Sequence, residues 1–188
     1  MPQPDNSNII FHLAADFINH THRHIFLTGK AGTGKTTFLK HIKEHTRKNT
    51  VVVAPTGVAA INAGGVTMHS FFQLPFGPFV PGTKRGFGTD EISSTDKHSL
   101  FRNIRFTNDK KVLLQEMELL IIDEVSMVRC DMLDAIDVIL RHFRNKPLLP
   151  FGGVQVLFIG DLYQLPPVVP DSEWRMLSEY YDRTFFFA

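Results

Sequence analysis

A glycine-rich loop that follows a short apolar run constrains the fold of this chain more than any other feature. Residues 25–39 read IFLTGKAGTGKTTFL. Gly29, Gly32 and Gly34 let the backbone turn so that its N–H groups converge on an anion, at the positive end of the helix that follows. The spacing is that of a phosphate-binding loop, which requires a strand before it and a helix after it.

The rest of the sequence alternates apolar runs with amphipathic segments. Strands are expected at residues 24–29, 49–57, 118–128 and 153–161, the first of them short and buried. Helices are expected at residues 9–19, 35–45, 58–65, 131–143 and 172–181, with Asp131 capping the fourth. Strands separated by helices predict an α/β fold of the P-loop NTPase class, with a mostly parallel β-sheet flanked by helices.

Residues 71–111 depart from this alternation. They are rich in Pro, Gly and Phe and have no sustained period, which predicts an inserted loop or small subdomain. Between residues 84 and 111, Lys and Arg outnumber Asp and Glu by seven to four. On composition alone, a solvated surface loop and a nucleic-acid-binding surface are equally favoured.

Length and composition limit the class of protein. The chain has 188 residues, of which 43% are hydrophobic, and this is enough for one domain with a full core. No apolar run is long enough to span a bilayer, and a single cysteine, Cys130, excludes an internal disulfide. We therefore expect a monomeric cytoplasmic protein with no membrane partner, associated with the nucleoid if the source is bacterial.

Side chains in and after the loop suit a magnesium nucleotide. Lys35 can reach the β- and γ-phosphates, and the Thr36 hydroxyl can hold Mg²⁺. Asp123 and Glu124 end an apolar strand, where Asp123 can hold Mg²⁺ through water and Glu124 can orient and deprotonate an attacking water. Gln164 follows the end of the next strand and can contact a γ-phosphate or that water.

Residues 54–72, APTGVAAINAGGVTMHSFF, follow the second expected strand. Thr56 and Gly57 offer hydroxyl and backbone donors to a phosphate, and His69 and Ser70 add donors beside an aromatic side chain. The residues alone leave two interpretations open. One is a contact with nucleic acid, and the other, slightly favoured here, is a tight strand-to-helix turn with ordinary core packing.

Four segments in this order and spacing, GKAGTGKTT, APTGVAAINAGGVTMHSFF, IIDEVSMV and GDLYQLPPV, strongly resemble the first RecA-like domain of the PIF (petite integration frequency) DNA helicases. The resemblance runs from about residue 9 to the end of the chain. It implies a superfamily-one motor that couples ATP hydrolysis to 5′-to-3′ movement on single-stranded DNA and to unwinding of forked duplex DNA, with ATP and Mg²⁺ as cofactors.

The resemblance also implies which residues act. Catalysis would use Lys35, Glu124 and Gln164. Mg²⁺ would be held by Thr36 and Asp123. ATP would be bound by Gly29, Ala31, Gly32, Thr33, Gly34, Lys35, Thr36, Thr37, Asp123 and Gln164. Single-stranded DNA would contact Thr56, Gly57, Val58, His69 and Ser70. Residues 71–111 would correspond to the region that holds the strand-separating wedge or pin.

Two departures from the family pattern bear on activity. The segment upstream of the loop, NIIFHLAADF, lacks the glutamine that reads adenine in helicases of this type. The sequence also stops at Ala188, before any second RecA-like domain, which would supply an arginine typically worth about 10³ to 10⁵ in rate. We therefore expect the chain alone to bind Mg²⁺-ATP, to hydrolyse it very slowly and not to unwind DNA.

Two other classes of function stay open from the sequence. A small-molecule kinase could use residues 71–111 as a lid over its substrate. A nucleotide-bound module could instead bind DNA or a protein partner without turnover. Single-stranded DNA should accelerate hydrolysis only in the motor, and only the kinase should phosphorylate a metabolite.

Overall fold

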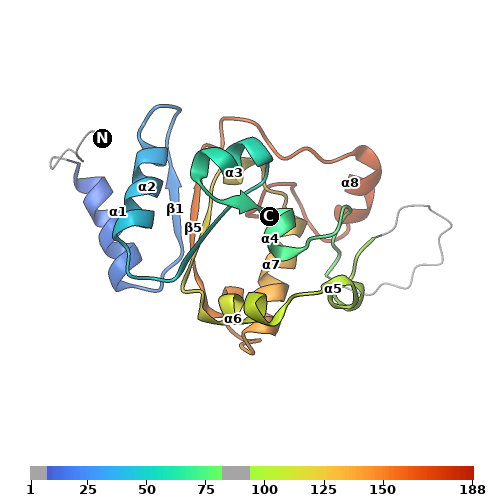
Figure 1. The fold of residues 1–188 in the computed structure, drawn as a ribbon. Helices are drawn as coiled ribbons and strands as arrows, with labels where there is room; N and C mark the ends of the chain where they lie inside the picture. Colours follow the sequence, from blue (N-terminus) through green and yellow to red (C-terminus); the bar gives the residue numbers. More distant parts are fainter. Residues whose placement is uncertain (1–7, 82–93) are drawn as a thin grey trace.

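The computed structural model describes residues 8–81 and 94–188 (Figure 1). Its strands are β1 (Ile25–Thr28), β2 (Thr50–Ala54), β3 (Val66–Thr67), β4 (Leu119–Ile122) and β5 (Gln155–Gly160). Within these residues the strands form one sheet in the order β1-β5-β4-β2-β3, and every neighbouring pair is parallel. Parallel neighbours require crossover connections, so the expected α/β fold is confirmed.

Helices cover both faces of this sheet. They are α1 (Ile9–His20), α2 (Lys35–His45), α3 (Gly57–Ala63), α4 (Met68–Phe72), α5 (Lys97–Asn103), α6 (Asn108–Glu116), α7 (Cys130–Phe143) and α8 (Asp171–Leu177), with the short 3₁₀ helices η1 (Val125–Met127) and η2 (Pro150–Gly153). In Figure 1, α1 and α2 lie beyond β1, whereas α4, α6 and α7 lie on the other side of the sheet. Ile18 of α1 and Leu39 of α2 share one buried cluster with Leu157 of β5.

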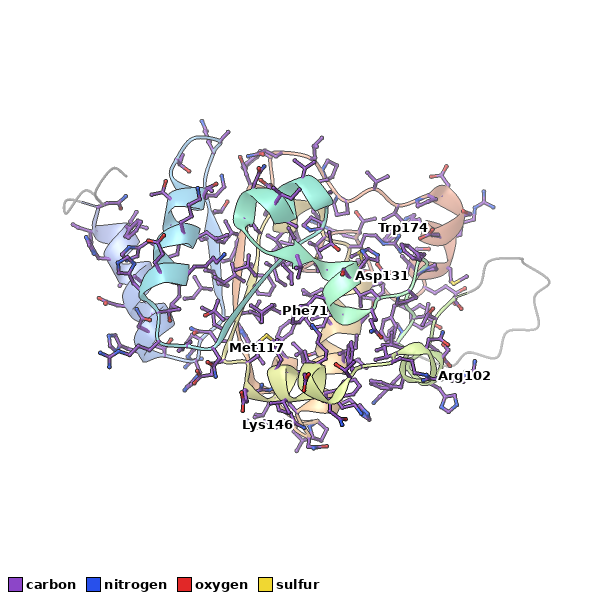
Figure 2. All side chains as sticks on the ribbon, in the orientation of Figure 1. Phe71, Arg102, Met117, Asp131, Lys146 and Trp174 are labelled. Atoms are coloured by element: carbon purple, nitrogen blue, oxygen red, sulfur yellow. The ribbon has the colours of Figure 1, made fainter. Side chains whose placement is uncertain are left out.

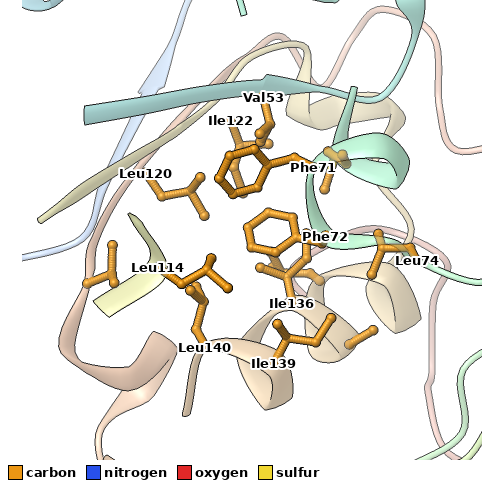
Figure 3. Close-up of a cluster of buried hydrophobic side chains, with 14 of the residues drawn as sticks. Val53, Phe71, Phe72, Leu74, Leu114, Leu120, Ile122, Ile136, Ile139 and Leu140 are labelled. Atoms are coloured by element: carbon orange, nitrogen blue, oxygen red, sulfur yellow. The ribbon is translucent and has the colours of Figure 1, made fainter. Parts of the chain in front are cut away.

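The larger core lies between the sheet and α4, α6 and α7 (Figure 3). Phe71 and Phe72 of α4 are buried there with Leu120 and Ile122 of β4 and with Ile136 of α7. Burying one such side chain stabilises the fold by about 1.5–3 kcal/mol. All four residues of β4 are buried, as expected for a central parallel strand that is covered on both faces.

The described part of residues 71–111 contributes to this main core. Phe79, Leu100, Ile104 and Phe106 belong to the same buried cluster as Phe71. The segment also contains α5 and the start of α6, which the sequence analysis did not predict, although Asp96 and Thr107 cap them as N-cap residues should. Residues 82–93, which carry part of the expected insertion, lie outside the described residues.

Three local expectations were wrong. The strand expected to be buried, β1, is an edge strand whose side chains alternate between half-buried and exposed, with Phe26 40% exposed. Asp131 does not cap α7: the N-cap residue is Arg129, and the Asp131 carboxylate is buried against it. The last helix ends at Leu177, because residues 178–180 form turns in place of the expected final turn of helix.

Candidate nucleotide and DNA site

The carboxyl ends of three neighbouring strands bring the expected nucleotide residues to one edge of the sheet. β5 pairs with both β1 and β4. The glycine-rich loop follows β1, Asp123 follows β4 and Asp161 follows β5. The positive charge of Lys35 acts to lower the pKa of both carboxyl groups, so the three side chains share one electrostatic environment. Ligands of open α/β sheets bind at this kind of edge.

The loop between β1 and α2 has a backbone that requires glycine. Gly32 and Gly34 have φ angles of 78° and 94°, in the left-handed region. Gly34 is the N-cap of α2, and it provides no side chain to occupy the first N–H groups of that helix. A Cβ at Gly29 would stand 2.6 Å from the hydroxyl oxygen of Thr33. The loop therefore presents backbone donors at a positive helix end, the property that binds phosphate.

The Lys35 side chain reaches back across this loop. Its ammonium donates to the carbonyl oxygens of Gly29 at 2.5 Å and Lys30 at 3.0 Å. Thr36 and Thr37 follow in the first turn of α2, and both are exposed. The loop thus holds a positive charge, and the first turn of α2 adds exposed hydroxyl groups next to it.

Asp123 and Glu124 form the second part of the site. Burial raises the pKa of the Asp123 carboxyl, and the neighbouring Glu124 carboxylate adds to the rise, while a backbone hydrogen bond from Glu124 and the Lys35 charge oppose it. Glu124 is the N-cap of η1 and has a φ of 51°, a left-handed conformation that costs a residue with a Cβ about 1–2 kcal/mol. Strain of this kind is concentrated at functional sites.

Asp161 and Gln164 form the third part. The Gln164 side-chain amide donates to the Asp161 carboxylate at 3.0 Å, and the Tyr163 backbone N–H donates to the same carboxylate at 3.1 Å. These two hydrogen bonds, with the Gln164 bond the larger cause, hold the pKa of Asp161 below its ordinary value. The sequence analysis gave a role to Gln164 and none to Asp161, although the position of Asp161 at the end of a strand was a usable signal.

The residues expected to contact DNA fall into two groups. Thr56 and His69 line one hollow of about 250 Å³, together with Arg129. The Thr56 hydroxyl caps α3 by accepting from the N–H of Ala59 at 3.2 Å, and this leaves its own proton free to donate. Gly57, Val58 and Ser70 are exposed outside this hollow's lining, on α3 and α4.

Two further observations concern ligands. Among residues 8–81 and 94–188, no group of three or more His, Cys, Asp or Glu side chains could hold a metal ion. Proteins usually hold Mg²⁺ with one or two oxygen ligands plus substrate phosphates, and Thr36 and Asp123 offer such oxygens. The same described residues include no helix long and apolar enough to cross a membrane.

A phosphate-binding loop on a parallel sheet, faced by carboxylates from two adjacent strands, is the arrangement of a P-loop NTPase with a RecA-like fold. The chain belongs to the PIF1-like helicase family, whose family model matches residues 4–178. The resemblance inferred from the four sequence segments is therefore confirmed.

Individual relatives agree with this assignment. The chain is 36% identical over 152 residues to the ATP-dependent DNA helicase PIF1 of Saccharomyces cerevisiae, covering 78% of the chain and 16% of the relative. It is 40% identical over 154 residues to Pif1 of Psychrobacter, covering 79% of the chain and 20% of the relative. The chain therefore spans about a fifth or less of these curated relatives.

Solved structures agree as well. Bacteroides Pif1 bound to single-stranded DNA matches with a TM-score of 0.81 and 47% identity, over 96% of this chain and 38% of that one. The Bacteroides protein in complex with ADP-AlF3 and single-stranded DNA gives the same TM-score and identity, over 95% of this chain and 38% of that one. Pif1 of Candida albicans matches with a TM-score of 0.69 and 31% identity, over 100% of this chain and 36% of that one.

Proposed function

We propose that this chain is the ATP-binding motor domain of a DNA helicase that moves 5′ to 3′ on single-stranded DNA and unwinds forked duplex DNA. The observation that carries the proposal is the meeting of Lys35, Asp123 and the Asp161–Gln164 pair at one sheet edge. Relatives described with a nucleotide analogue and single-stranded DNA support it, as does membership of the family. Nothing in this family membership favours the small-molecule kinase.

In the nucleotide site, each side chain has a distinct task. Lys35 exchanges its two loop carbonyl partners for phosphate oxygens, and backbone N–H groups of residues 29–37 bind the remaining phosphate oxygens. Thr36 and Asp123 would hold Mg²⁺, which would neutralise charge on the phosphates. Glu124 orients the attacking water and accepts its proton.

Gln164 is the residue that senses the γ-phosphate. Its side-chain amide donates a hydrogen bond to the Asp161 carboxylate, and the Lys35 charge in turn acts to lower the pKa of Asp161. A γ-phosphate that draws Lys35 toward itself would change the partners of Asp161 and Gln164 together. This couples the loop after β5 to the state of the nucleotide.

Thr56, Gly57, Val58, His69 and Ser70 contact single-stranded DNA. Only η1 and Val128 separate Glu124 from Arg129, which lines the hollow shared by Thr56 and His69. A shift of Glu124 on hydrolysis would therefore be passed along this segment to the DNA contacts, so that grip depends on the nucleotide state.

We assign residues 1–188 to one RecA-like domain, with residues 71–111 as an insertion that holds the strand-separating element. A second RecA-like domain is the partner that completes the ATP site across the cleft with an arginine. The domain acts as a monomer in the cytoplasm. By itself it binds Mg²⁺-ATP, hydrolyses it very slowly and does not unwind DNA.

The test compares ATP hydrolysis with and without single-stranded DNA, for the 188-residue chain and for the same chain joined to a second RecA-like domain. Glu124→Gln should lower the DNA-stimulated rate by about 10²- to 10⁴-fold and leave nucleotide affinity intact. Glu116→Gln, a change at an exposed position of α6, is the matched control and should leave the rate unchanged. Equal rates of ATP hydrolysis with and without single-stranded DNA, in both proteins, would overturn the proposal.

A further inference from the structure

Phe76 is exposed to an extent that its surroundings do not explain. Its side chain is 98% exposed, whereas the next most exposed of the described phenylalanines, Phe187, is 51% exposed. An apolar ring of this size is normally buried, because its exposure forgoes a large hydrophobic gain. This fully exposed aromatic side chain stands beside the hollow that Thr56 and His69 line, so it presents an open π-face to a ligand there.

The turn that carries Phe76 is held firmly at its base. The backbone N–H of Phe79 donates to the buried Asp131 carboxylate at 3.0 Å. Thr95 donates its N–H to the Pro78 carbonyl and accepts from the Val80 N–H, both at 2.9 Å. Because residues 78–80 are buried, the exposure of Phe76 is a property of a fixed turn.

Among the residues that the structure describes, the Phe76 ring has one aromatic neighbour, and that neighbour belongs to the proposed DNA site. It stacks on the His69 imidazole with 5.7 Å between ring centroids and 12° between planes. Burial, with the nearby Arg129 charge, lowers the pKa of His69 and so keeps the imidazole neutral at pH 7. The pair is therefore a flat, uncharged surface.

This surface adjoins the hollow that Thr56 and His69 share. Pro75 and Gly77, on either side of Phe76, line the same hollow. A DNA strand held through its backbone at Thr56 would bring its bases within reach of the exposed ring. Every nucleobase has a planar face, so stacking on an aromatic ring is tolerant of sequence, as a motor that travels along DNA requires.

We propose that Phe76, seated on His69, stacks against a nucleobase of the bound single strand. The inference rests on the proposed function, because it takes single-stranded DNA as the ligand of this face. It adds to the backbone contacts a base contact that those residues do not provide, and it assigns His69 the further task of supporting the ring. Loss of one base–aromatic stack should weaken binding by about tenfold, within the usual range for such contacts.

The test measures binding of the 188-residue chain to two dye-labelled probes by fluorescence anisotropy. One probe is a short oligothymidine, and the other is the same backbone with abasic sites in place of the bases. Phe76→Ala removes the ring, Phe76→Leu keeps an apolar side chain without a π-face, and Phe76→Trp keeps the π-face. Phe17→Ala, at a 43% exposed position on α1, is the matched control.

Phe76→Ala and Phe76→Leu should both bind oligothymidine about tenfold more weakly than the wild type, with little change toward the abasic probe. Phe76→Trp and Phe17→Ala should bind as the wild type does. Unchanged thermal unfolding and Mg²⁺-ATP affinity would show that each variant is folded. If the wild type binds DNA and Phe76→Ala binds equally well, base stacking is overturned and the proposed function stands. If the wild type binds neither probe, both proposals are overturned.

Discussion

Arg129 and Asp131 form a two-point ion pair at the start of α7. Nε of Arg129 lies 2.9 Å from Oδ1 of Asp131, and Nη2 lies 2.8 Å from Oδ2. The Asp131 side chain is fully buried, and Arg129 also donates to Glu173 of α8 at 2.7 Å. Figure 2 shows Asp131 inside the molecule, on the side where Trp174 of α8 lies. The pair thus joins α7, α8 and the turn of residues 75–80.

Asp131→Ala should destabilise the fold by about 3 kcal/mol, because it removes the two-point partner of the largely buried Arg129, which keeps its pair with Glu173, and leaves the Phe79 N–H without its acceptor. Urea unfolding monitored by circular dichroism gives the free energy directly. Asp16→Ala, at an exposed position of α1, should change it by less than about 0.5 kcal/mol. Equal losses for the two variants would show that the ion pair has no special role.

Gly34→Ala should weaken nucleotide binding by at least about tenfold. An added Cβ would meet no atom within 4 Å, so the defect arises from the φ of 94° alone, which costs an alanine about 1–2 kcal/mol. Gly57→Ala is the control, because Gly57 also has open space but lies outside the left-handed region. Calorimetric titration with Mg²⁺-ATP should show weaker binding for Gly34→Ala than for Gly57→Ala. An unaltered affinity for Gly34→Ala would contradict the role given to the left-handed conformation of Gly34.

His24 should make the fold less stable as the pH falls. Its Nδ1 accepts the Val156 N–H at 3.0 Å, which only an imidazole unprotonated at that nitrogen can do, and burial lowers its pKa, opposed in part by the Asp137 charge. Since the unfolded chain takes up the proton first, stability is full above about pH 6.5 and declines as the pH falls below that value.

His24→Gln tests this dependence. Unfolding free energies measured from pH 8 to pH 5 should fall less steeply in the variant. The difference in slope against pH should correspond to up to about one proton taken up on unfolding. His22→Gln, at a neighbouring position that is exposed as His24 is but has no hydrogen bond to the sheet among the described contacts, should retain the wild-type slope. Parallel curves for wild type and His24→Gln would rule out the predicted contribution.

Cys130 should resist alkylation until the protein unfolds. It is 2% exposed, its thiol donates to the Arg183 carbonyl at 3.3 Å, and burial raises its pKa to about 11. At pH 8, a thiol with this pKa carries about a hundredfold less thiolate than an ordinary cysteine does. Because the sequence has a single cysteine, the iodoacetamide reaction rate reports this site alone. Labelling at the rate of free cysteine in native buffer would refute the prediction.

Local sequence patterns were sufficient for much of the fold. The glycine spacing of the loop predicted a strand, a turn and a helix, and the helix at Lys35–His45 has the expected bounds. Thr56 caps α3, and the glycine after Ala63 ends it in the left-handed conformation. These features depend on interactions between residues a few positions apart, which a sequence displays directly.

Other features depended on contacts between distant segments. The edge position of β1 follows from strand order, which no property of residues 25–28 reveals. The helices at 97–103 and 108–116 were hidden because their apolar positions are few and their stability comes from packing against α7. Asp131 resembled a helix cap in sequence, and only the approach of Arg129 and Phe79 made it a buried ion-pair partner.

By itself, the sequence determined the chemistry that this protein carries: a loop for phosphate, carboxylates after apolar strands, and a family resemblance that the comparisons confirmed. Only the tertiary structure decided which of these groups meet, because parallel pairing of β1, β5 and β4 brings residues more than a hundred positions apart to one edge. It also decided that Phe76 stands exposed beside His69 while Leu74 and Phe79 of the same segment are buried. Residue types set what a side chain can do, and the packing of distant segments sets what it can reach.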